Sequence, residues 1–277
     1  MTLRRTVRLC VNPGDDPHAP PKGPNGFAGT PPMRGLGRYF EFDVTVTGEP
    51  DERSGYLVDI KTIDKAVRRA VYPRVATLCA ESPDREPAAA LPDLVEPLAE
   101  ALAPHRLRSI VWRLTPTYSV AMEIPPMSQT NMLGNDAPKR VLIRQRFDFA
   151  AAHRLHVEGV SDEDNRAMFG KCNNPSGHGH NYQVEPCVAI DPATEQGQGF
   201  SLAQLEALTD EVVIDHFDHL HLNVDTEEFG PSGVNPSVEN IARVAFERLA
   251  PAIAGAGAEL VSMTVWETDR TSCTYPA

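Results

Sequence analysis

Three histidines in the second half of the chain have the spacing of a metal site. His178 and His180 lie two residues apart at the start of a predicted strand, in "GKCNNPSGHGHNY" (170–182), so both side chains leave the same face. His153 ends the preceding predicted strand, in "AAAHRL". An isolated H-x-H is more often a surface pair, but the third histidine and the flanking glycines favour a ligand set. Three neutral imidazoles with an open fourth position are typical of catalytic zinc, so the sequence predicts one Zn²⁺ ion here.

Cys172 precedes the histidine pair in the same segment and would lie beside the bound ion. A nearby dication favours the thiolate form of a thiol, which makes Cys172 a candidate base or nucleophile. The alternative is that Cys172 is a fourth ligand, which would give a closed and inert site. Cys187, in the middle of a predicted strand, fits a small buried apolar residue better.

Acidic and imidazole side chains also adjoin in "DHFDHLHLN" (215–223). An aspartate bonded to a histidine fixes the tautomer of the ring, so that the ring can serve a neighbouring thiol. Three interpretations are open: the pair Asp215 and His216, the pair Asp218 and His219, or a polar helix end.

Composition limits the classes of protein to consider. The chain has 277 residues, 41% hydrophobic and 23% charged, which is typical of a globular protein of one large or two moderate domains. A net charge of -12 disfavours nucleic acid as a partner. No long apolar run or secretory leader occurs, so we expect no membrane span and no secretion. Five scattered cysteines without C-x-x-C spacing predict reduced thiols and a cytoplasmic location.

An internal repeat organises the chain. "RGLGRYFEF" (34–42) aligns with "SGHGHNYQV" (176–184), which sets Leu36 and Arg38 against the two histidines. Two further matches follow in the same order, near 55 and 199 and near 109 and 262. The segment 125–140 is rich in proline, glycine and asparagine and is predicted to be a linker between domains 1–124 and 141–277. Residues 13–35 are predicted to be a long loop.

Each half is predicted to have two strands, two helices and two strands. In the second half these are strands at 141–152, 181–190, 260–268 and 272–275, with helices at 201–213 and 237–253, each headed by a serine cap. Pro186 predicts an edge strand or a bulge. The first half is expected to repeat the pattern, with strands near 4–11, 38–48, 107–114 and 118–124. The fold class is therefore α+β, with two tandem units, each an antiparallel four-stranded sheet with two helices on one face.

The motifs "AAHRL", "NRAMFGKCNNPSGHGHNYQV", "DHLHLN", "PSVEN" and "VWETD" occur in an order and spacing that resembles the 6-pyruvoyl-tetrahydropterin synthase family of tunnelling folds. The likeness covers nearly all of 141–277. It implies that the three histidines bind zinc and that Cys172 is the catalytic proton acceptor. It also implies that Asp218 and His219 are the partners of Cys172, and that Glu267 anchors the pterin through paired hydrogen bonds.

The resemblance implies a zinc-dependent lyase that converts 7,8-dihydroneopterin triphosphate to 6-pyruvoyl-tetrahydropterin with loss of triphosphate and no redox cofactor. Lys171, Arg154 and Arg166 are near enough in sequence to bind the triphosphate. The family usually has two threonines where this chain has Ser237 and Val238, so a hydroxyl contact to substrate is expected from Ser237 alone.

Two other functions are considered. One is the related 6-carboxytetrahydropterin synthase of the queuosine pathway, although the Cys172 to His178 spacer looks more like the pyruvoyl enzyme. The other is a non-catalytic pterin or metal carrier, in which Cys172 would have no purpose. In the first half, Arg113 aligns with Glu267, and Arg74 and Val75 with Asp218 and His219, so that half is expected to bind neither zinc nor pterin. The resemblance implies that family members with one copy of the fold assemble as hexamers. Three chains with two copies each would supply the same six units, so a homo-oligomer of three chains is expected.

Overall fold

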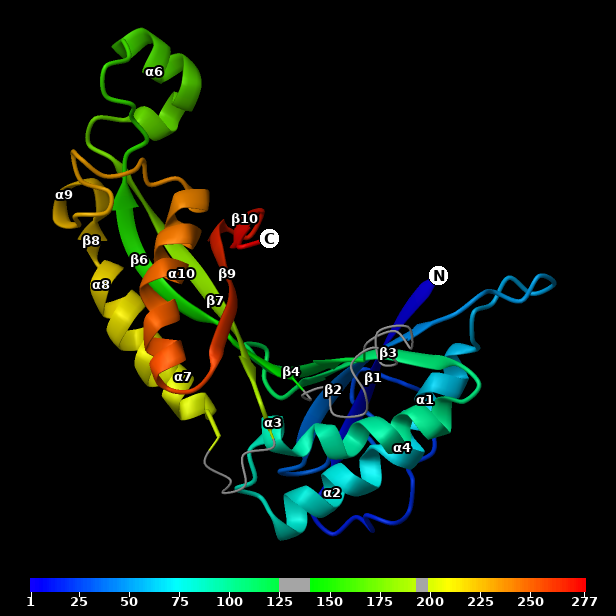
Figure 1. The fold of residues 1–277 in the computed structure, drawn as a ribbon. Coiled ribbons are helices and arrows are strands. Elements are labelled where there is room, and N and C mark those ends of the chain that lie inside the picture. Colours follow the sequence, from blue (N-terminus) through cyan, green and yellow to red (C-terminus); the bar gives the residue numbers. More distant parts are fainter. Residues whose placement is uncertain (125–139, 193–198) are drawn as a thin grey trace. The chain divides into compact units, whose positions relative to one another are not determined.

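The structure is a computed structural model that describes residues 1–124, 140–192 and 199–277. The chain forms two compact units: unit 1 is Met1–Ile143 with Ile190–Gly199, and unit 2 is Arg144–Ala189 with Phe200–Ala277. Each unit contains both strands and helices (Figure 1). No helix in the described ranges is long and apolar enough to cross a membrane.

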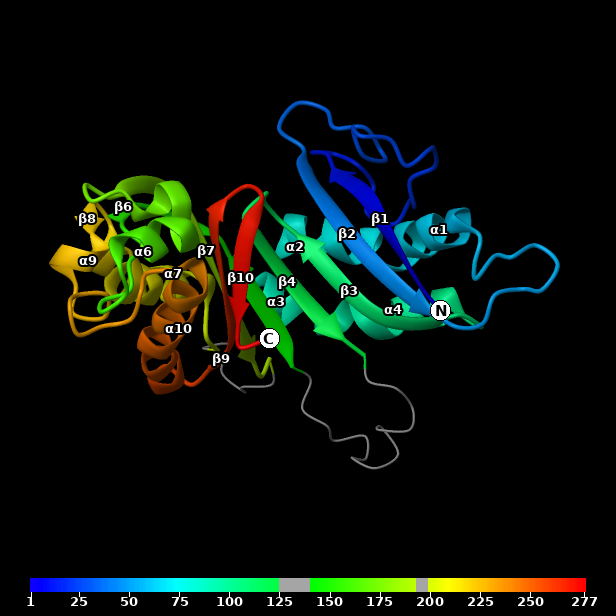
Figure 2. The same ribbon diagram turned by 90° about the horizontal axis from the view of Figure 1, so that it is seen from above.

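Unit 1 contains an antiparallel sheet in the order β1-β2-β3-β4. Its strands are β1 (Thr2–Val11), β2 (Arg38–Thr47), β3 (Arg106–Arg113) and β4 (Tyr118–Glu123). Buried residues alternate along the strands, since Val44, Val46, Ile110 and Val120 are all fully buried. Figure 2 shows the four strands side by side with the helices behind them. One face of the sheet therefore supplies the core of this unit.

The helices of unit 1 all cover that face of the sheet (Figure 1). They are α1 (Ile60–Ala70), α2 (Tyr72–Glu81), α3 (Pro87–Ala90) and α4 (Pro92–Leu102). The Asp59 side chain caps α1 by accepting a hydrogen bond from the Lys61 backbone N–H. Ile63, Leu94 and Leu98 are fully buried beneath the sheet, so the helices and strands share one apolar core.

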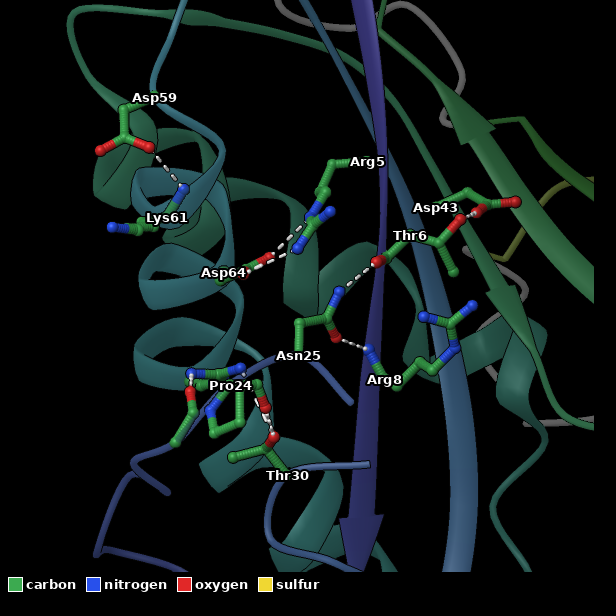
Figure 3. A network of polar contacts seen from close by, with 12 residues as sticks. Arg5, Thr6, Arg8, Pro24, Asn25, Thr30, Asp43, Asp59, Lys61 and Asp64 are labelled. Atoms are coloured by element: carbon green, nitrogen blue, oxygen red, sulfur yellow. Dashed lines mark hydrogen bonds and ion pairs between the residues drawn. The ribbon is translucent and has the colours of Figure 1, made fainter. Parts of the chain in front are cut away.

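The loop between β1 and β2 is fastened to the outer edge of β1 (Figure 3). The Asn25 side chain accepts from the Arg8 backbone N–H at 2.9 Å and donates to the Thr6 carbonyl at 2.7 Å. Beside it, Arg5 donates two hydrogen bonds to Asp64 on α1, at 2.9 and 3.0 Å. These polar contacts order a segment that the sequence identifies only as a loop.

Unit 2 has a five-stranded sheet in the order β8-β6-β7-β9-β10, in which β8 is parallel to β6 and the other pairs are antiparallel. The strands are β6 (Phe147–His153), β7 (His178–Ile190), β8 (Leu220–His221), β9 (Glu259–Thr268) and β10 (Thr271–Tyr275). A short strand, β5 (Val141–Gln145), precedes them. The long central strand β7 places its first residues at one end of the sheet, where β6 ends.

Helices α7 and α10 cover one face of the unit 2 sheet, whereas α6 lies beyond the ends of β6 and β7 (Figure 1). The helices are α6 (Asp162–Phe169), η1 (Gly170–Asn173), α7 (Leu202–Thr209), η2 (Asp210–Ile214), α8 (Asp215–Phe217), α9 (Leu222–Asp225) and α10 (Val238–Gly255). Ser201 and Ser237 cap α7 and α10, as predicted.

The α+β class is confirmed, and the predicted strands lie within a few residues of those observed. The predicted make-up of each unit, four antiparallel strands and two helices, is wrong in two respects. Among the residues that the structure describes, unit 1 has four helices, and the unit 2 sheet has a fifth strand, β8, that is parallel to β6. Smaller details also differ. The strand predicted at 141–152 is two strands, β5 and β6, and the helix predicted at 201–213 continues from α7 into the π-helical turn η2. For Pro186, the edge-strand alternative is wrong because β7 is a central strand, whereas the bulge alternative agrees with the register shift at Cys187/Val188. Of the predicted linker 125–140, residues 125–139 lie outside the described residues, and the tandem duplication stays a prediction.

Strand pairing relates the two units by a different register from the sequence alignment. Val11, the last residue of β1, pairs with Arg38, the first of β2, just as His153 pairs with His178. By this register Arg38 corresponds to His178, and Phe40 to His180. The alignment of the glycine motifs set Leu36 and Arg38 against the histidines. It therefore differs from the strand pairing by one side-chain repeat of the strand, since Arg38 is matched with His180 instead of His178.

Candidate metal centre and active site

The three predicted ligands come together where β6 ends and β7 begins. His153 and His178 are paired across the two strands, and His180 follows on the same face of β7. Their ligand atoms all lie within 4.8 Å of one another. Gly177, with φ +70, leads into β7, and a Cβ atom there would lie 2.6 Å from the His221 ring. A side chain is therefore excluded immediately before the cluster.

Hydrogen bonding and burial prepare these rings to bind a cation. His153 is fully buried, and its Nδ1–H donates to the Pro236 carbonyl at 2.7 Å, which leaves Nε2 unprotonated. Burial lowers the pKa of His153 to about 4, against the hydrogen bond to Pro236, which raises it. Burial also lowers the pKa of His178. Both rings therefore favour the neutral form that a metal requires.

The arrangement fits a zinc ion. The Nε2 atoms of His153 and His178 are 3.1 Å apart, close to the separation of about 3.3 Å between nitrogens that share a tetrahedral zinc. The His180 Nε2 atom is buried and has no hydrogen-bond partner among the described residues. A cation would satisfy this nitrogen and would lie between two rings that otherwise face each other.

Glu267 and Tyr182 lie beside the histidine cluster. Glu267, on β9, places its Oε1 atom 3.5 Å from His153 Nε2 and 3.6 Å from His180 Nε2. Tyr182 is fully buried, and burial, followed by the charges of Glu267 and Cys172, raises its pKa. Sequence analysis included Glu267 but missed Tyr182. The signal was available, because Tyr182 continues the alternation that starts at His178.

Cys172 lies in η1 and, with His178, lines a cavity of about 610 Å³. It is half-buried, and it is not part of the group whose ligand atoms lie within 4.8 Å, which favours the open site over the closed one with four ligands. Lys171 and Arg166 line the same cavity. The Arg154 side chain instead donates to the Asn173 carbonyl at 3.3 Å, so it is engaged in holding the loop.

Two buried asparagines that sequence analysis missed order the irregular chain between β6 and β7, which includes Cys172. Asn165 accepts from the Val157 N–H and donates to three carbonyl groups, at 3.1 to 3.2 Å. Asn173 donates to the Leu155 carbonyl at 2.7 Å, and the Leu155 N–H donates to the Cys172 carbonyl at 2.9 Å. The irregular segment before β7 thus has its backbone groups satisfied by side chains.

The structure distinguishes the interpretations of the 215–223 segment. Asp218 accepts from the Ala150 N–H at 2.8 Å and contacts His219 Nδ1 at 2.7 Å, and these two bonds lower its pKa, the backbone bond most. His216 pairs instead with Glu228, at 3.1 Å. The His219 side chain is 83% exposed, on a residue with φ 59. Among the described residues, neither Asp218 nor His219 forms a hydrogen bond or ion pair with Cys172.

Ser237 supports the centre from the start of α10. Its Oγ atom accepts from the Asn240 N–H at 3.4 Å, and it directly follows Pro236, whose carbonyl orients His153. The hydroxyl therefore fixes the helix end that positions a ligand. Its remaining hydrogen is still available to another acceptor.

Comparisons with known proteins agree with this site. The family model for 6-pyruvoyl tetrahydropterin synthase matches residues 142–277. The human 6-pyruvoyl tetrahydrobiopterin synthase is 38% identical over 135 residues, which are 48% of this chain and 89% of the human protein. A putative 6-pyruvoyl tetrahydrobiopterin synthase of Caenorhabditis elegans is 39% identical over 138 residues, 49% of this chain and 94% of that protein.

A solved structure of the Caenorhabditis elegans 6-pyruvoyl tetrahydropterin synthase aligns with 49% of this chain and 94% of that chain, at 35% identity and a TM-score of 0.45. The range matched by the family model holds the three histidines, Cys172 and Glu267. Through that range, the chain belongs to the 6-pyruvoyl tetrahydropterin synthase family.

Proposed function

We propose that the chain is a zinc-dependent lyase that converts 7,8-dihydroneopterin triphosphate to 6-pyruvoyl-tetrahydropterin and releases triphosphate. The observation that carries the proposal is the cluster of His153, His178 and His180 in a member of this family, in which the buried His180 Nε2 atom has no hydrogen-bond partner among the described residues. Zinc held there would supply Lewis-acid polarisation of the side-chain oxygens of the substrate.

The other groups of the site have separate roles in this proposal. The Glu267 carboxylate accepts the paired donors of the aminopyrimidine edge of the pterin. Cys172 takes a proton from the substrate side chain as a general base. Lys171 and Arg166, which line the same cavity as Cys172, bind the triphosphate. Ser237 donates its free hydroxyl hydrogen to the pterin end of the substrate.

Asp218 and His219 complete the proton path. Asp218 holds His219 Nδ1, so the Nε2 atom is left to exchange protons. Because this imidazole is largely exposed, we infer that it serves the Cys172 of a second copy of the chain. This inference supports the predicted homo-oligomer, with three chains as the favoured assembly.

Unit 1 has the scaffold role in this assembly. It repeats the strand order of unit 2, and by strand register it has Arg38 and Phe40 where unit 2 has His178 and His180. We infer a degenerate copy that binds no zinc and contributes sheet and helices. None of the five cysteines, all in the described ranges, forms a disulfide, which supports the proposed cytoplasmic location.

Product analysis separates the candidate functions. Purified zinc-loaded protein is incubated with 7,8-dihydroneopterin triphosphate, and the pterin product is identified by mass spectrometry. Formation of 6-pyruvoyl-tetrahydropterin with stoichiometric triphosphate supports the proposal. A 6-carboxy product would assign the chain to the queuosine branch of the family. Binding of the pterin without turnover would make it a carrier.

A further inference from the structure

Unit 1 contains a cavity of its own, of about 490 Å³, at the end of β2 and β3. The sheet contributes Arg38, Phe40 and Trp112 to the lining, and α2 contributes Leu78 and Cys79. This volume is within the range of small-molecule sites and accommodates a molecule of two fused rings. No role in the proposed reaction uses this cavity.

The cavity occupies the place in unit 1 that corresponds to the metal centre of unit 2. Arg38 and Phe40 have the register positions of two zinc ligands. Trp112, a further lining residue, corresponds to Glu267 by the same strand register. Trp266 pairs with the sixth residue of β7 and Val111 with the sixth residue of β2, so the next residues, Glu267 and Trp112, correspond. This revises the alignment that set Arg113 against Glu267.

The exchange of Glu267 for Trp112 changes what the position can recognise. A carboxylate accepts hydrogen bonds, whereas an indole only donates. The Trp112 ring is 4% exposed, and its buried Nε1–H has no acceptor among the described residues. A buried N–H without an acceptor costs free energy, which a bound molecule with an acceptor atom would recover.

The charges of the lining include one guanidinium without a carboxylate partner. Arg85 is paired with Asp93 at 2.7 Å. Arg38 is exposed, and its side chain forms a hydrogen bond with the Cys79 thiol. No carboxylate of the described residues forms an ion pair with Arg38. Asp84 and Glu86, from the loop between α2 and α3, also line the cavity. Their negative charge opposes a polyanion such as a triphosphate, but a single carboxylate on Arg38 is compatible with it.

We propose that this cavity binds a planar, two-ring aromatic carboxylate that carries a second hydrogen-bond acceptor. The carboxylate pairs with Arg38, and the second acceptor receives the Trp112 Nε1–H. The rings lie among Phe40, Leu78 and Trp112, where Phe40 and Trp112 already pack edge to face at 5.5 Å. Without a carboxylate at the Trp112 position, the site does not hold the aminopyrimidine edge of a pterin.

Three related probes test the two polar contacts separately on the full-length protein. The probes are 4-oxo-1H-quinoline-2-carboxylate, quinoline-2-carboxylate without the oxo acceptor, and 4-quinolone without the carboxylate. Ligand-observed NMR titration measures their affinities. We expect saturable binding of the first probe with a dissociation constant of about 1 mM or below. A His178→Ala His180→Ala variant should bind it equally well, which separates this site from the proposed pterin site.

Two variants assign the contacts. Arg38→Gln should weaken both carboxylates about tenfold or more and leave 4-quinolone unchanged, as expected for a lost charge-assisted pair. Trp112→Phe keeps an aromatic ring and should weaken only the two probes with the oxo group. Arg69→Gln removes an exposed arginine of α1 outside the cavity and should change nothing.

Alkylation by iodoacetamide gives a second measurement that needs no variant. Cys79 lines the cavity and Cys273 lies in unit 2, so bound 4-oxo-1H-quinoline-2-carboxylate should slow modification of Cys79 and not of Cys273. The proposal is overturned if none of the probes saturates by about 10 mM, in the affinity range of nonspecific contacts. Equal loss of binding in the Arg38→Gln and Arg69→Gln variants, or 4-quinolone binding as tightly as the carboxylates, would also overturn it.

Discussion

Acid should destabilise the metal-free form of unit 2 through His153. Its native pKa is about 4, against an ordinary value of 6.5, because the ring is buried. Between these two pH values His153 is protonated in the unfolded chain but neutral in the native chain. The contribution of His153 to the free energy of unfolding is therefore fully present above pH 6.5 and is lost as the pH falls towards 4. The linkage relation gives a loss of about 2 kcal/mol by pH 5 and about 3 kcal/mol by pH 4.

A substitution isolates this contribution from other titrating groups. His153→Asn cannot titrate, yet its side-chain amide can still donate to the Pro236 carbonyl, as the Nδ1–H does. The difference in unfolding free energy between the parent and His153→Asn should therefore shrink by about 3 kcal/mol from pH 7 to pH 4. Acid effects common to both proteins cancel in this difference.

The assay must report on unit 2 alone, because two units need not unfold together. The chain has two tryptophans, Trp112 in unit 1 and Trp266 in unit 2. In a Trp112→Phe background, urea unfolding of chelator-treated protein is followed by Trp266 fluorescence at each pH. Parallel pH profiles for the parent and His153→Asn proteins would refute the argument that burial keeps this ring neutral.

The remaining predictions concern the catalytic groups and the loop that holds them. Cys172→Ala should retain one zinc per chain by metal analysis and lose turnover by about 10²- to 10⁴-fold, and loss of zinc would instead support a fourth ligand. Glu267→Gln should lower kcat/KM about 10- to 100-fold through pterin binding, and unchanged kinetics would remove Glu267 from the site. Asn165→Ala removes the side-chain donor shared by the Val157, Val160 and Ser161 carbonyls, so amide exchange in residues 155–165 should accelerate and turnover should fall. Unchanged exchange would contradict its anchoring role.

Strand periodicity was sufficient to predict that the three histidines of the cluster lie together. His178 and His180 share a face by the two-residue repeat, and His153 meets them because the adjoining strand ends at the same level. Contacts between distant segments gave no such signal. The carbonyl that orients His153 belongs to Pro236, 83 residues away, and depends on how α10 packs. Tertiary packing likewise decides that α7 continues into a π-helical turn, which periodicity alone does not reveal.

The alignment of the two halves by sequence disagrees with the alignment by strand pairing, for a physical reason. Glycines in "RGLGRYFEF" and "SGHGHNYQV" match as letters, but pairing is set by where each strand meets its neighbour. The observed pairing starts β2 at Arg38, so the residues beside the unit 1 cavity are Phe40 and Trp112 rather than Leu36 and Arg113. An alignment by turn residues carries no information about this shift.

The side chain of Asn25 has a consequence for aggregation. An exposed edge strand is a template on which another chain can grow, and β1 is the outer strand of the unit 1 sheet. Asn25 engages the Thr6 carbonyl and the Arg8 N–H, and the Thr30 N–H engages the Arg8 carbonyl at 3.1 Å, so the middle of this edge is already occupied. The loop between β1 and β2 therefore hinders the addition of a strand from another chain to β1, as would occur in a fibril. An assembly that joins sheets edge to edge must do so without this stretch of β1, which restricts the arrangements open to several chains.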